Sequence, residues 1–284
     1  IDFLGNITLL SKMNDQGTLN RDAWETVFIY PTIDTTVSTG VETDGQHYYV
    51  CGWSVPYFQK YDMQGNLEGT FTVPGVQDIR DMAYDGQYFY GGSTSAPTQI
   101  HVMDLANETL VETWALPFKV RAIAFNDDEN VFYVNDWSDD IKVVGYGGSV
   151  LDTIPLDYYG TYYGFAYDNW TEGGPYLWGL SQESNSLALL VQMELPSGEE
   201  TGFVLDLGYL ANSGGYGGGL FTHPEPDSNR VIIGGVIQNE SIFGLELGDT
   251  NPQPISGYAV NYLHSQHYDS ADVLLTWDPA RYYL

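Results

Sequence analysis

One phrase recurs along the chain about every 41 residues and constrains the fold more than any other feature. Each copy is an extended run ending in an aromatic residue, then an acidic turn, then a second run of aromatic or β-branched residues. The clearest copies are segments 40–50 and 81–90. The copies align, with steps of 41, 41, 42, 54 and 47 residues, at Thr43, Tyr84, Phe125, Tyr167, Phe221 and Tyr268. Self-similarity at this period is typical of stacked four-stranded units, and the spacing predicts six.

Each unit is predicted to hold four strands, because short apolar or aromatic runs are repeatedly closed by turn residues. Asp44-Gly45 and Asp85-Gly86 close the first hairpin of two units, and such dipeptides favour tight hairpin turns. No stretch has a sustained 3.6-residue apolar period, so little helix is expected.

The two ends of the chain complement each other in this pattern. After Tyr268 there is room for one further strand, residues 273–277. Segment 7–17 resembles segment 58–65, a third strand and its turn, and segment 24–30 is predicted as a fourth strand. We therefore expect a composite sixth unit, two strands from each end, that closes a ring and leaves only short, protected sheet edges.

On these repeats and turns, the sequence resembles the β-propeller superfamily, and more loosely the secreted, repeat-containing propellers of bacterial surface proteins. The resemblance spans nearly the whole chain and implies an all-β, six-bladed propeller of four-stranded antiparallel blades. No full signature of the tryptophan-aspartate, kelch or low-density-lipoprotein-receptor propellers is present, and a shared fold does not carry a function. Six units fill residues 1–284 as a single domain without a separate module.

Charge and cysteine content bound the partners and the location. The net charge is −29, from 38 acidic and nine basic residues, which argues against nucleic acid and anionic membranes because both need clustered Lys and Arg. Cys51 is the single cysteine, so no intramolecular disulfide is expected. No twenty-residue apolar run is present, so no membrane insertion is expected. The composition indicates a secreted or cell-surface protein whose leader is absent from this fragment, either monomeric or part of a larger chain.

Familiar catalytic and metal motifs are missing from the sequence, so no catalytic residue, cofactor or metal ligand is assigned. Calcium is the one ion considered, at the acidic segments 126–130 and 136–140. Neither has the spacing or the central glycine of a helix-loop-helix calcium site, and Asp and Asn also form good turns.

The strand pattern predicts a ring of residues at one mouth of the channel. Four residues before each repeat aromatic, the chain has Thr39, Arg80, Arg121, Tyr163, Gly217 and His264. Loops on a rigid scaffold commonly carry function. Paired arginines would recognise a carboxylate or phosphate, although nearby carboxylates such as Asp78 or Asp81 would neutralise them.

Tryptophans add an aromatic element to the same face. Trp53, Trp137 and Trp277 lie at or next to the ends of three predicted second strands. Such rings beside polar loops would stack on sugar faces or anchor a peptide, and the alternative is packing between blades.

These features favour a binding or interaction module for a glycan or extended peptide over an enzyme. Two alternatives stay open. One is a hydrolase or lyase acting on an acidic polysaccharide, with Asp81 and Asp136 as its candidate carboxylates. The other is a structural domain that spaces or docks parts of a larger secreted protein.

Overall fold

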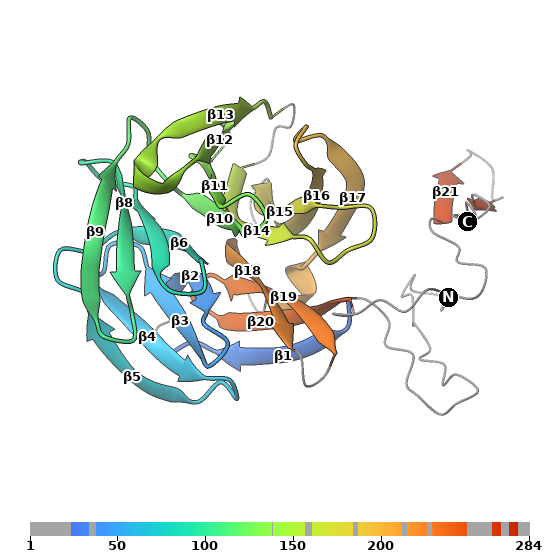
Figure 1. Cartoon of the computed structure of the whole chain (residues 1–284). Coiled ribbons are helices and arrows are strands. Elements are labelled where there is room, and N and C mark those ends of the chain that lie inside the picture. The colour runs from blue at the N-terminus through green and yellow to red at the C-terminus, as the bar shows by residue number, and fades with distance from the viewer. Residues whose placement is uncertain are drawn as a thin grey trace. The chain divides into compact units, whose positions relative to one another are not determined.

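The computed structural model describes residues 24–33, 38–137, 139–156, 161–183, 187–211, 215–225, 229–248, 263–267 and 273–277. Contacts divide the chain into two compact units, residues 1–250 and 251–284. The first unit contains five four-stranded antiparallel sheets arranged as blades around a central channel (Figure 1). None of the described helices is long and apolar enough to cross a bilayer.

The first four blades are each built from consecutive strands. Blade one contains β2 (Ser38–Thr43), β3 (His47–Gly52), β4 (Tyr57–Asp62) and β5 (Leu67–Thr72); blade two contains β6 (Ile79–Tyr84), β7 (Phe89–Ser93), β8 (Gln99–Asp104) and β9 (Thr109–Ala115). Blade three contains β10 (Ala122–Asn126), β11 (Val131–Asn135), β12 (Ile141–Val144) and β13 (Val150–Ile154); blade four contains β14 (Thr161–Asp168), β15 (Tyr176–Glu183), β16 (Leu187–Glu194) and β17 (Glu200–Asp206). Two short 3-10 turns, η1 (Tyr146–Gly148) and η2 (Gly208–Leu210), are the helical elements among the described residues.

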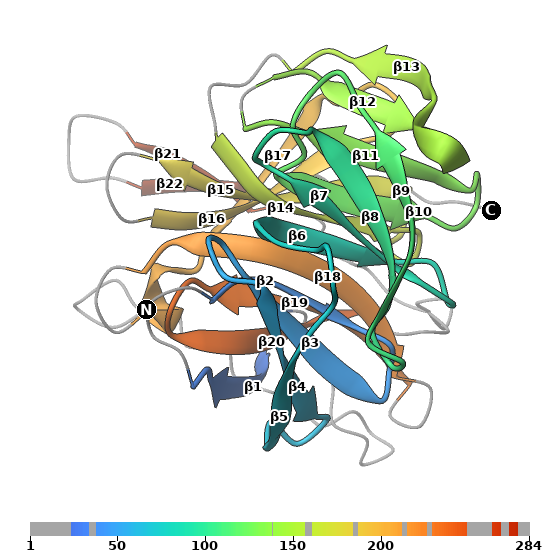
Figure 2. The same ribbon diagram turned by 90° about the vertical axis from the view of Figure 1, so that its left-hand side faces the viewer.

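The fifth blade closes the ring with a strand from the other end of the chain. It contains β18 (Gly217–Glu225), β19 (Arg230–Ile237), β20 (Ser241–Gly248) and, at its outer edge, β1 (Thr26–Pro31). Strand β1 pairs antiparallel with β20, with Ile29 opposite Phe243. Both ribbon views show the two strands side by side (Figure 2).

The prediction of six blades is therefore wrong, and the ring has five. Segment 24–30 does form an outer strand, but it completes the fifth blade beside three strands from late in the chain. Strands β21 (Leu263–His267) and β22 (Val273–Trp277) pair with each other in a separate two-stranded sheet. Segment 7–17 and Tyr268 lie outside the described residues.

Five hydrophobic cores, one between each pair of adjacent blades, give the physical reason for this number. The fifth core joins the last blade to the first, where the rings of Tyr48 and Phe221 lie 5.8 Å apart. With these two blades packed directly against each other, no gap remains for a sixth. The other four cores hold, in order around the ring, Tyr49 with Phe89, Tyr90 with Phe132, Tyr133 with Leu177, and Trp178 with Phe243.

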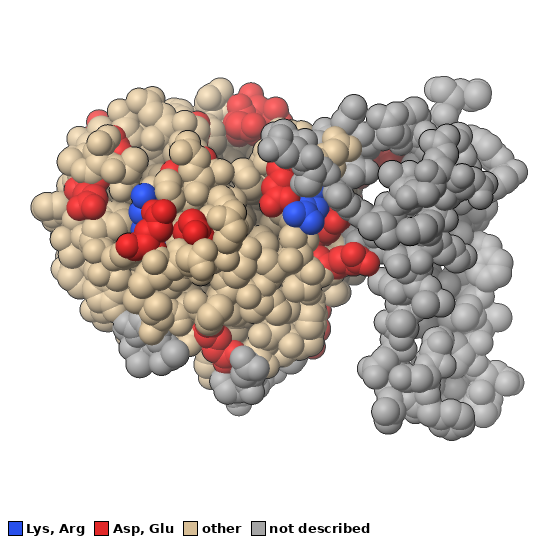
Figure 3. Space-filling view, turned by 90° about the horizontal axis from the view of Figure 1, so that it is seen from below, with Lys and Arg blue, Asp and Glu red and all other residues tan. Residues whose placement is uncertain are grey.

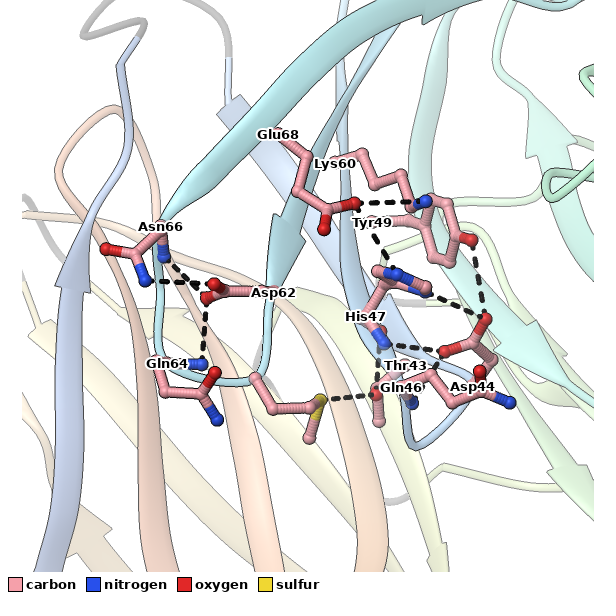
Figure 4. Close-up of polar contacts among 11 residues, drawn as sticks. Thr43, Asp44, Gln46, His47, Tyr49, Lys60, Asp62, Gln64, Asn66 and Glu68 are labelled. Carbon is pink, nitrogen blue, oxygen red and sulfur yellow. Dashed lines mark hydrogen bonds and ion pairs between the residues drawn. The ribbon is translucent and has the colours of Figure 1, made fainter.

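The recurring acidic turn has a structural role that the structure makes explicit. In blade one, Asp44 Oδ1 accepts the backbone N–H groups of Gln46 and His47 at 2.8 and 2.7 Å, and Tyr49 donates its hydroxyl to Oδ2 at 3.3 Å. Figure 4 shows this cluster. It also shows the contacts that His47 and Lys60 make with the carboxylate of Glu68 on the outer strand β5. The turn residue thus fixes the hairpin and orients an aromatic residue of the second strand.

The same arrangement recurs in three further blades. Asp85 binds the Tyr90 hydroxyl at 2.7 Å, Asn126 donates to the Tyr133 hydroxyl at 3.0 Å, and Asp168 accepts from the Trp178 ring N–H at 2.9 Å. Each also accepts backbone N–H groups two and three residues further along. The fifth blade departs from the pattern: Thr222 occupies the position and donates its hydroxyl to the Tyr167 carbonyl at 2.6 Å.

Candidate functional site

The inner strands β2, β6, β10, β14 and β18 surround the channel, each contacting the next, and β18 contacts β2 to complete the ring. Because all five begin at the same mouth of the channel, their first residues are brought together there (Figure 1). The members of the predicted mouth that lie in the five blades are Thr39, Arg80, Arg121, Tyr163 and Gly217. His264 and Trp277 lie in the second unit, on β21 and β22, which form a sheet separate from the five blades.

Arg80 is the unusual charge of this mouth. Its guanidinium carbon lies 4.6 Å from the centre of the Trp53 ring, which belongs to the loop after β3 of the preceding blade. No carboxylate among the described residues lies within 4.0 Å of it, and its buried Nε has no hydrogen-bond partner there. Arg80 is thus a half-buried guanidinium supported by an aromatic ring rather than by a carboxylate.

Arg121 sits differently. Its guanidinium carbon lies 3.6 Å from the centre of the Trp137 ring, and its Nε donates to Asp136 Oδ1 at 2.5 Å. The side chain is largely buried. Asp136 therefore pairs with Arg121, whereas no carboxylate among the described residues forms an ion pair with Arg80.

The two arginines and Tyr163 share one electrostatic environment. Burial lowers the pKa of Arg80, and the charge of Arg121 lowers it further, while Tyr163 and Asp78 oppose the shift. Arginine has an ordinary pKa so high that it stays protonated near neutrality. Burial raises the pKa of Tyr163, against the opposing effect of both arginines, so its phenol stays a neutral hydrogen-bond donor.

The two tryptophans of this mouth keep a substantial exposed surface. Trp53 is 48% exposed and Trp137 is 36% exposed. The backbone N–H of Trp53 donates to Thr39 Oγ1 at 3.1 Å, and the Trp137 ring lies 6.0 Å from that of Tyr163. Thr39 in turn donates to the Ile79 carbonyl at 3.4 Å. Each tryptophan therefore contacts an arginine and still presents area to solvent.

Asp81, directly after Arg80, lies across the channel below this mouth and is 1% exposed. Its Oδ2 accepts the backbone N–H groups of Ile123 at 2.9 Å and Phe165 at 3.0 Å, from two other blades. Burial raises its pKa well above the usual range, and the backbone donors oppose this. Asp81 and Asp136, the carboxylates that a polysaccharide hydrolase or lyase would need, are thus both engaged in structural contacts.

The two acidic segments considered for calcium are also used in structural contacts. Asn126 Oδ1 accepts the backbone N–H groups of Asp128 and Glu129, and the Asp136 carboxylate forms an ion pair with Arg121. Within the described residues, no group of three or more His, Cys, Asp or Glu side chains is placed to hold a metal ion.

Comparison with known proteins supports the fold and does not indicate a function. The crystal structure of glutaminyl cyclase from Myxococcus xanthus superposes with a TM-score of 0.59 at 12% identity, covering 79% of this chain and 97% of the cyclase. Hydrazine synthase from Kuenenia stuttgartiensis is more distant, with a TM-score of 0.44 at 14% identity over 72% of this chain and 57% of that one. No protein-family model and no curated protein sequence matches the chain. The chain has a β-propeller fold.

Proposed function

We propose that this propeller is the binding module of a secreted or cell-surface protein, and that the mouth formed by Thr39, Trp53, Arg80, Trp137 and Tyr163 recognises a carboxylate-bearing glycan. The observation that carries the proposal is the Arg80 guanidinium, which rests on Trp53 without a carboxylate partner. A planar guanidinium binds carboxylates through two parallel hydrogen bonds.

The charge of the protein makes such an arginine informative. The chain carries 38 acidic residues against nine basic ones, so an arginine would readily find a carboxylate on this surface. Figure 3 shows acidic groups spread over the drawn face and few basic ones among them. Leaving a buried charge unpaired costs free energy unless a partner compensates it. A ligand carboxylate would supply that compensation in the bound state.

The exposed tryptophans favour a sugar as the remainder of the ligand. Pyranose rings present flat apolar faces, and large aromatic side chains provide area for such contacts. Trp53 and Trp137 keep 48% and 36% of their surface exposed, so both rings are accessible to such a ligand.

A glycan array carrying matched neutral and uronate-containing oligosaccharides tests the proposal directly. We expect binding to uronate-containing glycans, and a loss of at least about tenfold in Arg80→Gln, the equivalent of about 1.4 kcal/mol. Trp53→Ala should weaken binding to a similar degree. Lys60→Gln, which removes an equal charge that contacts Glu68 on blade one, is the matched control and should bind normally.

Three results would overturn the proposal. One is binding that survives both Arg80→Gln and Trp53→Ala. Another is equal binding of neutral and acidic glycans. The third is binding to a peptide C-terminal carboxylate with no glycan bound, which would assign the mouth to peptides instead.

A further inference from the structure

A concave site lies at the end of the channel opposite Arg80 and Arg121, where the inner strands end. It is a cavity of about 250 Å³. Its walls come from all five blades, including Glu42 of β2, Tyr84 of β6, Phe125 of β10, Tyr167 of β14 and His223 of β18. This volume is below that of sites for drug-sized ligands, and suits a group the size of one side chain.

Glu42 differs in character from the residues at the equivalent positions of the other four blades. It precedes the turn residue Asp44 by two positions, and the equivalent positions of the other blades hold Ala83, Ala124, Ala166 and Leu220. Ala124, Ala166 and Leu220 line the same cavity. One blade therefore places a carboxyl group where the repeat otherwise places a small or apolar side chain.

The Glu42 carboxyl group is buried and incompletely paired. The residue is 7% exposed, and its Oε1 accepts the Thr43 backbone N–H at 2.8 Å. Among the described residues, no donor reaches Oε2. Burial raises the pKa of Glu42 well above its usual range, and the charges of Asp81 and Asp44 raise it further. A buried carboxyl group is costly to ionise unless a cation or donor compensates it.

The surroundings of Glu42 favour a cation over an anion. A second cavity of about 250 Å³ shares Tyr84, Phe125 and Tyr167 with the first and adds Asp85 and Asp127. No Lys or Arg lines either cavity. Burial lowers the pKa of His223 below its usual 6.5, so its imidazole is neutral near pH 7 and does not repel a cation.

We propose that this pocket binds a primary alkylammonium group of the kind a lysine side chain carries, with Glu42 as its counter-ion. Carboxylates combined with aromatic rings are a recurrent way to hold an ammonium group, because the ring faces also attract positive charge. Calcium is less well suited, since it takes six to eight oxygen ligands and no group of three acidic, His or Cys side chains converges among the described residues. The site is separate from the arginine mouth and does not depend on its function.

Isothermal titration of the intact chain with Nα-acetyl-lysine methylamide at pH 7.5 tests the site. Glu42→Gln keeps the shape of the side chain and removes its charge, so it should fold normally and weaken binding at least tenfold. Glu108→Gln, in the exposed turn between β8 and β9, changes the net charge equally and should leave the affinity unchanged. Arg80→Gln should also leave it unchanged, which separates this site from the glycan site.

A neutral ligand and an inorganic cation test whether the site recognises an ammonium group. The Nε-acetylated form of the same ligand should bind at least tenfold more weakly, and calcium should not compete. The proposal is overturned if the acetylated ligand binds equally, if Glu42→Gln binds like the native protein, or if calcium binds and the amine does not. Binding of glycinamide in preference to the lysine probe would also overturn it, because the site would then read an α-amine.

Discussion

Asp81 on β6 accepts a hydrogen bond from the backbone N–H of Phe165 on β14, 3.0 Å away, and so joins the second blade to the fourth across the channel. The same oxygen accepts the Ile123 N–H of the third blade. A single side chain therefore ties three blades together beneath the arginine mouth, and it directly follows Arg80 in the chain.

Removing this carboxyl group should destabilise the propeller. Asp81→Ala leaves two buried N–H donors unpaired, at about 1–3 kcal/mol each, partly offset by no longer burying a carboxyl group. We expect a lower urea midpoint for Asp81→Ala and a smaller loss for Asp81→Asn, whose side-chain oxygen can still accept. Equal midpoints for native protein and Asp81→Ala would contradict the assigned role.

Gly164 marks a close approach between inner strands. A Cβ at this position would collide with the backbone of Gly218 and Leu220 on β18. Gly164→Ala should therefore lower the free energy of unfolding by about 2 kcal/mol or more, since backbone cannot yield as a flexible side chain does. Gly69→Ala, on the outer strand β5 where a Cβ meets nothing within 4 Å, is the matched control and should change it by at most about 0.5 kcal/mol. Similar losses in both variants would contradict crowding at Gly164 as the cause.

Asp85, the turn residue of the second blade, should contribute more to the free energy of unfolding than a surface aspartate does. Asp85 accepts two backbone N–H groups and the hydroxyls of Tyr90 and Tyr146. Asp85→Ala should cost about 1–3 kcal/mol in chemical denaturation. Asp152→Ala, which loses one bond to the next residue on an exposed strand, should cost much less. A larger effect at Asp152 would contradict this reading of the repeat.

Glu42 should make stability depend on pH in a defined direction. Its folded-state pKa is raised above the ordinary value of 4.5, so the stabilisation of the native protein relative to Glu42→Gln is complete below that value. This stabilisation falls by about 1.4 kcal/mol per pH unit as the pH rises from the ordinary pKa of glutamate towards the raised folded-state pKa, and it is lost above the latter. Urea melts of both proteins from pH 4 to 8 measure the difference. A stability difference that stays constant with pH, or that grows in favour of the native protein as the pH rises, would refute the raised pKa of Glu42.

Much of the architecture follows from the repeat, because each copy carries its own turn chemistry. Asp44-Gly45 and Asp85-Gly86 predict hairpins, and β2–β3 and β6–β7 form them. The number of blades does not follow from the repeat, because the hairpin β21–β22 has the residue pattern of a blade. Only the packing of Phe221 on Tyr48 shows that the ring is complete without it.

The candidate sites were predictable to different degrees. The repeat offset alone placed Arg80, Arg121 and Tyr163 at or directly before the starts of three successive inner strands. It did not show that Asp136 pairs with Arg121 and leaves Arg80 without an ion partner, because that depends on loop conformation: Trp137 adopts a positive φ of 64°. Glu42 was missed, although aligning it with Ala83, Ala124 and Ala166 would have exposed it as the one acidic member of its position.

The placement of β1 at the outer edge of the fifth blade has a consequence for how the protein is made. Strand β1 leaves the ribosome before any complete blade, yet its partner β20 is the last strand of the ring to appear. During synthesis β1 has no native partner while four blades assemble, and the edge of β20 stays open until the two ends meet. The nascent chain therefore passes through an open arc with a bare strand edge, the stage at which pairing with a neighbouring chain competes with folding.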